Sequence, residues 1–174
     1  MEKIKLVVPS LRYDKQIWNY KQDFFTRGES LAGGGTLERV DSVKAWLEDV
    51  KRYSNVATCP SDRVPSSLYL AIRESDDTLV GMIDIRHHIN HPILSTWGGH
   101  IGYSVLSSQR GKGYAKEMLR LSLHICKHLG IDKILITCDE NNLASRKTIL
   151  ANGGNYEKTI PVEGKMTQRY WINL

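Results

Sequence analysis

The sequence predicts an α/β or α+β fold in which helices cover both faces of a mixed sheet. Strand-like and helix-like hydrophobic patterns follow one another in the order β-α-α-β-β-β-α-β-α-β-β. Residues 134–138 form a continuous apolar run, which is typical of a strand buried on both faces. The chain has 174 residues, 41% of them hydrophobic and 25% charged, which fits one globular domain over residues 1–174.

The first third of the chain predicts one strand and two helices. Residues 3–8 form the predicted strand, and residues 11–27 place apolar side chains at helical spacing. Three glycines at 33–35 break this pattern, and Thr36 then begins a second amphipathic helix. Residues 55–66 contain two prolines and are predicted to form a loop.

The middle of the chain predicts a hairpin followed by a third strand. Residues 68–72 and 79–85 are apolar segments joined by a polar turn at 74–78. A histidine-rich loop follows, and residues 100–106 form the next strand. This region therefore supplies three strands of the sheet.

The C-terminal part alternates helices with strands. A helix with one apolar face runs from Ala115 to Gly130, and a shorter one over 143–152 ends at two glycines. The last two predicted strands cover residues 156–161 and 168–172.

The balance of charges favours an anionic partner. Lys and Arg total 24 against 19 Asp and Glu, which gives a formal net charge of +5. This excess suits a phosphorylated cofactor. It is too small, and its basic residues are too scattered, to predict binding to nucleic acid.

Cysteines, histidines and hydropathy predict a cytoplasmic protein without a metal site. Cys59, Cys126 and Cys138 are odd in number and form no C-x-x-C pair, so neither a disulfide framework nor a zinc ribbon is expected. Cys126 and Cys138 lie among apolar residues and are expected to be buried. The six histidines lack the three convergent ligands that a catalytic zinc needs. Mean hydropathy is −0.36, and neither a membrane span nor a signal peptide is recognisable.

The turn between residues 105 and 115 carries the strongest functional signal. A strand ends, two cations and two glycines alternate as Arg110, Gly111, Lys112 and Gly113, and a helix begins at once. Glycines let backbone N–H groups converge on an anion, and a helix N-terminus adds about half a positive charge. A pyrophosphate is the natural ligand of such a turn, and an ordinary turn with solvated charges is the alternative.

Two other phosphate-binding motifs do not fit this turn. The chain contains no G-x-x-x-x-G-K-[ST] string, and Lys116 stands where G-x-G-x-x-G requires its third glycine. About 60 residues follow the turn, too few for a doubly wound nucleotide-binding domain.

The run from Arg110 to Ala115 resembles the R/Q-x-x-G-x-G/A signature of the GNAT superfamily, the acyl-CoA-dependent N-acyltransferases. Residues 100–105 resemble the family's E-I-G-Y-type strand, and residues 142–154 resemble its Asn-led helix that ends near a glycine. The resemblance is strongest over about 100–154, which is the implied cofactor-binding core.

This resemblance implies a mostly antiparallel twisted sheet of about seven strands. Its central parallel pair splays apart and receives the pantetheine arm of acetyl-CoA. Strand residues would bond to the arm, the turn would hold the pyrophosphate, and the Asn-led helix would approach the arm from the next strand. The implied cofactor-binding residues are Tyr103, Val105, Arg110, Gly111, Lys112, Gly113, Tyr114, Ala115, Asn142 and Ser145. For Asn142 a plain helix N-cap is an alternative that can coexist with cofactor contact.

Two positions depart from the family pattern at the catalytic centre. His100 stands where many relatives carry a Glu, so it is the candidate general base, with a purely structural histidine as the alternative. Ile149 stands where many relatives carry a tyrosine taken as the general acid, and isoleucine cannot donate a proton.

The predicted function is transfer of acetyl from acetyl-CoA to a primary amine of a small molecule or a peptide. The alternative is a non-catalytic acyl-CoA-binding or sensor module on the same fold, which Ile149 and the missing Glu motivate. Neither nucleic acid nor a membrane is an expected partner, and a homodimer is left open.

Overall fold

The computed structural model describes residues 2–174, which build two antiparallel sheets. The first has the order β1 (Ile4–Val7), β2 (Ser66–Arg73), β3 (Thr78–Arg86) and β4 (Ile101–Val105), and the second the order β5 (Lys133–Asp139), β7 (Lys165–Asn173) and β6 (Asn155–Val162). The expectation of about seven mostly antiparallel strands is confirmed, as is the hairpin of β2 and β3.

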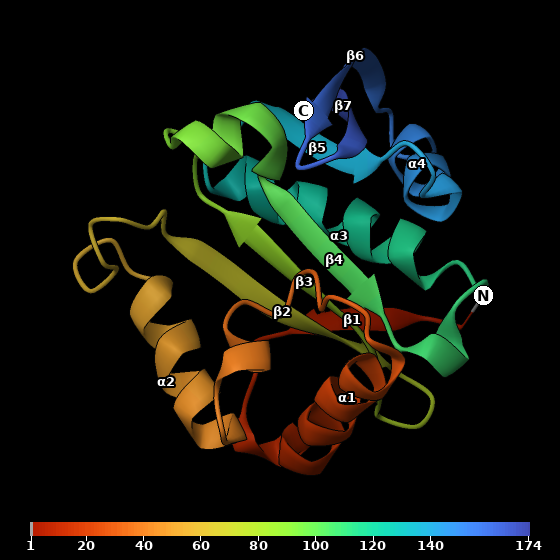
Figure 1. Cartoon of the computed structure of the whole chain (residues 1–174). Coiled ribbons are helices and arrows are strands. Elements are labelled where there is room, and N and C mark those ends of the chain that lie inside the picture. The colour runs from red at the N-terminus through yellow and green to blue at the C-terminus, as the bar shows by residue number, and fades with distance from the viewer. Residues whose placement is uncertain (1) are drawn as a thin grey trace.

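Helices cover both faces of the first sheet, as the sequence predicts (Figure 1). On one face α1 (Asp14–Arg27) and α2 (Val43–Tyr53) pack onto β2 and β3 around the fully buried Trp46. On the other face α3 (Tyr114–His128) buries Met118 and Leu119 against the sheet, and α4 (Leu143–Leu150) lies beside α3. The sheet is therefore the middle layer between two hydrophobic cores.

The second helix begins later than predicted. Thr36 precedes only a short 3-10 turn at Leu37–Arg39, and α2 starts at Val43. The Thr36 hydroxyl donates a hydrogen bond to Asp49 (2.7 Å) rather than capping a helix. Ser42 caps α2 instead, because its Oγ accepts the N–H of Ala45 at 3.1 Å.

A short π-helical segment at Leu94–Gly98, which the sequence does not predict, lies between β3 and β4 and contacts the second sheet. Arg86 of β3 donates to the carbonyls of Gly98 and Gly99 at 3.0 and 3.1 Å. Arg169 of β7 donates to the carbonyls of Ser95, at 2.7 Å, and Thr96. One arginine from each sheet thus holds the segment that leads into β4.

The cysteines are free thiols, and the predicted burial of Cys126 and Cys138 is confirmed. Within residues 2–174, none of the helices combines the length and the apolar character needed to cross a bilayer.

Candidate active site

Strands β4 and β5 meet at one point and diverge from it. The N–H of His100 donates to the carbonyl of Leu135 (2.8 Å), and the N–H of Leu135 donates back to Nδ1 of His100 (2.9 Å). Beyond this contact β4 pairs with β3, and β5 pairs with β7. Since β4 and β5 touch at this contact and then pair with different strands, they fit the splayed pair that the family resemblance implies.

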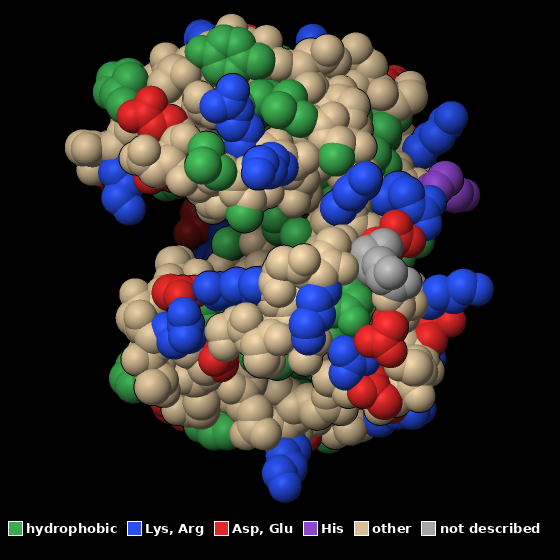
Figure 2. All heavy atoms as spheres, turned by 90° about the vertical axis from the view of Figure 1, so that its right-hand side faces the viewer, with side chains coloured by type: hydrophobic (Ala, Val, Ile, Leu, Met, Phe, Trp, Pro, Cys, Tyr) green, Lys and Arg blue, Asp and Glu red, His purple; other side chains and the backbone are tan. Residues whose placement is uncertain are grey.

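A cavity with a volume of about 620 Å³ is lined by the end of β4 and by α4, the helix that follows β5. Its walls come from the end of β4, the turn into α3, the first turns of α4 and the loop after α1. Figure 2 shows a hollow between two halves of the molecule, with Lys and Arg side chains on both of its rims. The volume is within the range of about 300–1,000 Å³ that is usual for small-molecule sites.

The turn at the N-terminus of α3 presents backbone N–H groups that have no acceptor among the described residues. Gly111 and Gly113 have φ values of +76° and +86°, a conformation that glycine adopts without strain. Among the described residues, no protein acceptor is found for the backbone N–H groups of residues 111–116. Consecutive free N–H groups at a helix N-terminus form an anion-binding concavity, so this turn fits a pyrophosphate.

The cavity gathers the predicted cofactor residues, with the exception of Lys112. The Nζ of Lys112 donates to Oε1 of Gln109 at 3.0 Å, and its side chain does not line the cavity. Lys112 can therefore reach a ligand of this turn through its backbone N–H, which has no acceptor among the described residues. Actual contact with a cofactor stays a prediction for all ten residues.

The Arg110 side chain is held by the protein itself. Its guanidinium pairs with both carboxylate oxygens of Glu29, lies 5.5 Å from the centre of the Phe24 ring, and donates from Nε to the Val105 carbonyl at 3.2 Å. These hydrogen bonds lower the pKa of Glu29 to about 2. The guanidinium thus bridges the turn to the loop after α1 rather than extending freely toward a phosphate.

A pair of hydroxyl groups spans the cavity. Tyr103 Oη on β4 lies 2.8 Å from Oγ of Ser145 on α4. Burial raises the pKa of Tyr103 to about 12, so this phenol stays protonated at neutral pH. Asn142 caps α4, because its Oδ1 accepts the N–H of Ser145 at 3.1 Å. Asn142 also lines the cavity. Ile149 is fully buried in the core.

His100 lies outside the cavity lining and is 5% exposed. Burial lowers its pKa to about 4. Since Nδ1 accepts the Leu135 N–H, the neutral ring carries its proton on Nε2. These contacts favour the structural role over the predicted general base. A base needs a free accepting nitrogen, and Nδ1, the accepting nitrogen of the ring, is already bonded to the Leu135 N–H.

Several lining residues were not predicted from the sequence. Gln109, Lys116, Lys147 and Glu29 all contribute to the walls. Lys116 and Lys147 could have been found, since they lie on the first turns of the two helices that border the implied cofactor site. Glu29 carried no local signal.

Comparison with known proteins agrees with this geometry. Residues 13–155 match the family model described as an acetyltransferase (GNAT) domain. No curated protein sequence matches the chain at a significant level.

Solved structures of similar fold include three acetyltransferases. The ribosomal-protein-S5-alanine acetyltransferase from Vibrio fischeri has a TM-score of 0.74 at 13% identity, over 99% of this chain and 94% of that one. The microcin C7 self-immunity acetyltransferase MccE, solved with acetyl-CoA and AMP, has a TM-score of 0.67 at 16% identity, over 100% of this chain and 94% of that one. RimL, a ribosomal L7/L12 α-N-protein acetyltransferase solved with coenzyme A, has a TM-score of 0.68 at 18% identity, over 98% of this chain and 94% of that one. At these identities the likeness shows a shared fold.

Proposed function

The chain belongs to the GNAT family of acetyltransferases, and we propose that it transfers acetyl from acetyl-CoA to a primary amine by direct attack of the amine nitrogen. One observation carries this proposal above all others. The free N–H groups of residues 111–116 border a cavity that is lined by the end of β4 and by the helix that follows β5. Acetyl-CoA supplies the acyl group as a reactive thioester.

The cavity residues divide into groups with different tasks. The N–H groups of 111–116 would hold the pyrophosphate, with Lys116 and Lys147 adding positive charge from two helices. Tyr103 and Val105 would line the path of the pantetheine arm. Positioning of the two reactants in this cavity is expected to supply much of the rate acceleration.

The protein offers hydroxyl donors rather than a carboxylate base at the reacting end. Of the carboxylates in residues 2–174, only that of Glu29 lines the cavity. Hydrogen bonding from Arg110 lowers the pKa of Glu29 to about 2. A group that binds protons so weakly is a poor base. We therefore infer that the amine enters deprotonated and that its nitrogen forms the new C–N bond as the C–S bond breaks. The Ser145 hydroxyl, held by Tyr103, donates a hydrogen bond to the departing thiolate, and the extra proton on the nitrogen passes to solvent water.

The Ser145→Ala variant tests that role. We expect kcat to fall by about 10- to 100-fold, a modest loss because a thiol of pKa near 8.5 leaves tolerably as an anion. The KM for acetyl-CoA should stay within about twofold, since the pyrophosphate contacts remain. Ser145→Thr keeps a hydroxyl and should recover most of the rate. Equal rates for Ser145→Ala and the wild type would remove this assignment.

The Glu29→Gln variant tests the electrostatics of the cavity. Removing this negative charge should tighten acetyl-CoA binding by about two- to fivefold, because repulsion of the phosphates falls and Arg110 is released. Calorimetry gives the dissociation constants, and Glu48→Gln, at an exposed position of α2 outside the cavity, serves as the control. Weaker binding by Glu29→Gln would mean that the Glu29–Arg110 pair supports the donor site instead.

The acceptor is proposed only as a class. Ribosomal-protein acetyltransferases among the similar structures make the α-amine of a peptide the first acceptor to test, with small-molecule amines as the second. A cytoplasmic location and one domain over 1–174 remain predictions, and a homodimer is left open.

Thiol release from acetyl-CoA tests the function directly. The panel should contain peptides with free N-termini, matched peptides with blocked N-termini, and small primary amines. We expect amine-dependent release with one of these classes. Binding of acetyl-CoA without release above the rate of hydrolysis for any amine would favour the non-catalytic acyl-CoA-binding alternative.

A further inference from the structure

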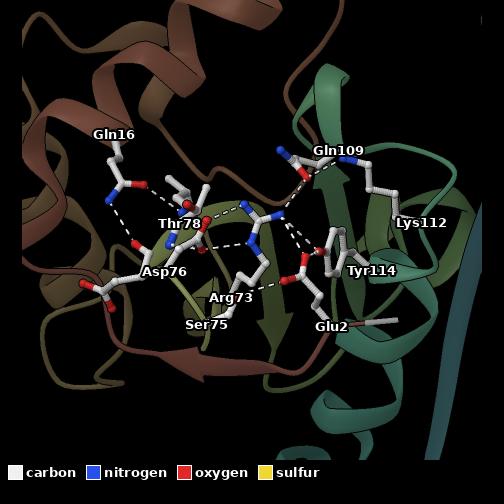
Figure 3. Close-up of polar contacts among 11 residues, drawn as sticks. Glu2, Gln16, Arg73, Ser75, Asp76, Thr78, Gln109, Lys112 and Tyr114 are labelled. Carbon is white, nitrogen blue, oxygen red and sulfur yellow. Dashed lines mark hydrogen bonds and ion pairs between the residues drawn. The ribbon is translucent and has the colours of Figure 1, made fainter.

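Arg73, the last residue of β2, lies behind the pyrophosphate turn (Figure 3). Its side chain is 13% exposed, and Asp76 accepts from Nε at 2.9 Å and from Nη2 at 2.7 Å. This two-point pairing fixes the plane of the guanidinium. The remaining terminal nitrogen, Nη1, is thereby directed away from Asp76.

Nη1 contacts both ends of the turn. It donates to Oε1 of Gln109 at 3.1 Å and to Oη of Tyr114 at 3.3 Å. Gln109 is the residue before the turn 110–113, and Tyr114 is the first residue of α3 after it. One nitrogen atom therefore links the two residues that bracket the four-residue turn.

The partners of this link are themselves fixed. The ring of Tyr114 is 2% exposed and packs in the core beneath α3, and its hydroxyl also donates to Glu2 at 3.3 Å. Oε1 of Gln109 accepts a second hydrogen bond, from Lys112 of the turn. The hydroxyl of Tyr114 thus points toward Arg73 rather than toward the cavity (Figure 3).

We propose that Arg73 is a positioning residue of the donor site, which sets the separation of Gln109 and Tyr114 and so aligns the free N–H groups of the turn before acetyl-CoA binds. The proposal rests on the proposed function, since it assumes that these N–H groups hold the pyrophosphate. Because the turn has two glycines and little internal hydrogen bonding, it needs such an external support. Preorganisation of this kind strengthens binding by lowering the ordering cost.

The test compares Arg73→Met with Arg120→Met in the full chain. Arg120 also pairs with a carboxylate three residues away, Glu117, but lies on α3 outside the cavity. Within residues 2–174 its side chain makes no hydrogen bond or ion pair with the turn. We expect Arg73→Met to raise the dissociation constant of acetyl-CoA by about tenfold, and Arg120→Met to change it by less than about twofold. Arg73→Lys should recover part of the affinity.

A double-mutant cycle separates positioning from a general loss of structure. Tyr114→Phe removes the hydroxyl that Arg73 holds, and should weaken binding by about threefold in the wild type but have no further effect beside Arg73→Met. If Arg73→Met does not fold, Asp76→Asn, which breaks the two-point pairing that fixes the plane of the guanidinium, takes its place in the cycle. Unchanged affinity of folded Arg73→Met, or fully additive effects in the cycle, would overturn the positioning role. Absence of acetyl-CoA binding by the wild type would overturn the proposed function itself.

Discussion

The Gly113→Val variant should bind acetyl-CoA at least about 100-fold more weakly than the wild type. Gly113 has a φ of +86°, where a β-branched residue is strained, and it lies in the cavity lining. A valine side chain would also project where the backbone has to approach the phosphates. Calorimetry with acetyl-CoA measures the loss.

Gly130→Val is the matched control for this variant. Gly130 follows the other end of α3 with a φ of +74°, and no atom lies within 4 Å of the place of its missing Cβ. It carries the same backbone strain without a contact to the cavity. Both variants should lose stability, and only Gly113→Val should lose affinity. Similar affinities in folded Gly113→Val and the wild type would place the pyrophosphate elsewhere.

His100→Ala should act on stability much more than on catalysis. Removing the ring leaves the Leu135 N–H without its acceptor in a buried position, which costs about 1–3 kcal/mol of unfolding free energy. His100→Asn, whose Oδ1 can replace Nδ1 as an acceptor, should recover part of this. Denaturant unfolding gives the stabilities, and kcat/KM of the folded variants should stay within about threefold of the wild type. A 100-fold loss of kcat/KM in a stable His100→Asn protein would restore the general-base assignment.

The same residue predicts a dependence of stability on pH. The pKa of His100 is about 4 in the folded protein and near 6.5 in an unfolded chain, so the unfolded state binds the proton first as the pH falls. The stabilisation is fully present above pH 6.5 and is lost between about pH 6.5 and 4. His100→Asn should remove this part of the pH profile. Parallel profiles for the variant and the wild type would contradict the buried neutral histidine.

Patterns of neighbouring residues were enough to predict the conformation of the turn and most of the helices and strands. Gly111 and Gly113 beside a helix start predict the positive φ values that the turn has, because the conformation is encoded in adjacent residues. The burial of β5 and the cap at Asn142 follow from equally local signals.

Side-chain partners distant in sequence could not be predicted. Arg110 meets Glu29 across 81 positions, and Arg73 meets Tyr114 across 41, so no spacing rule connects them. The start of α2 was misplaced for a similar reason, since Asp49 binds the Thr36 hydroxyl that would have served as a cap. For His100 the sequence left two roles open, and the distant Leu135 favours one of them.

Hydrogen exchange followed by mass spectrometry, with and without saturating acetyl-CoA, tests the central claim most directly. In the free protein the N–H groups of residues 111–116 have no protein acceptor and should exchange fast. Acetyl-CoA should slow exchange in peptides that cover 110–117 and leave the β6–β7 hairpin unchanged. Binding of acetyl-CoA with no protection of residues 111–116 would contradict the assignment of this turn as the pyrophosphate site.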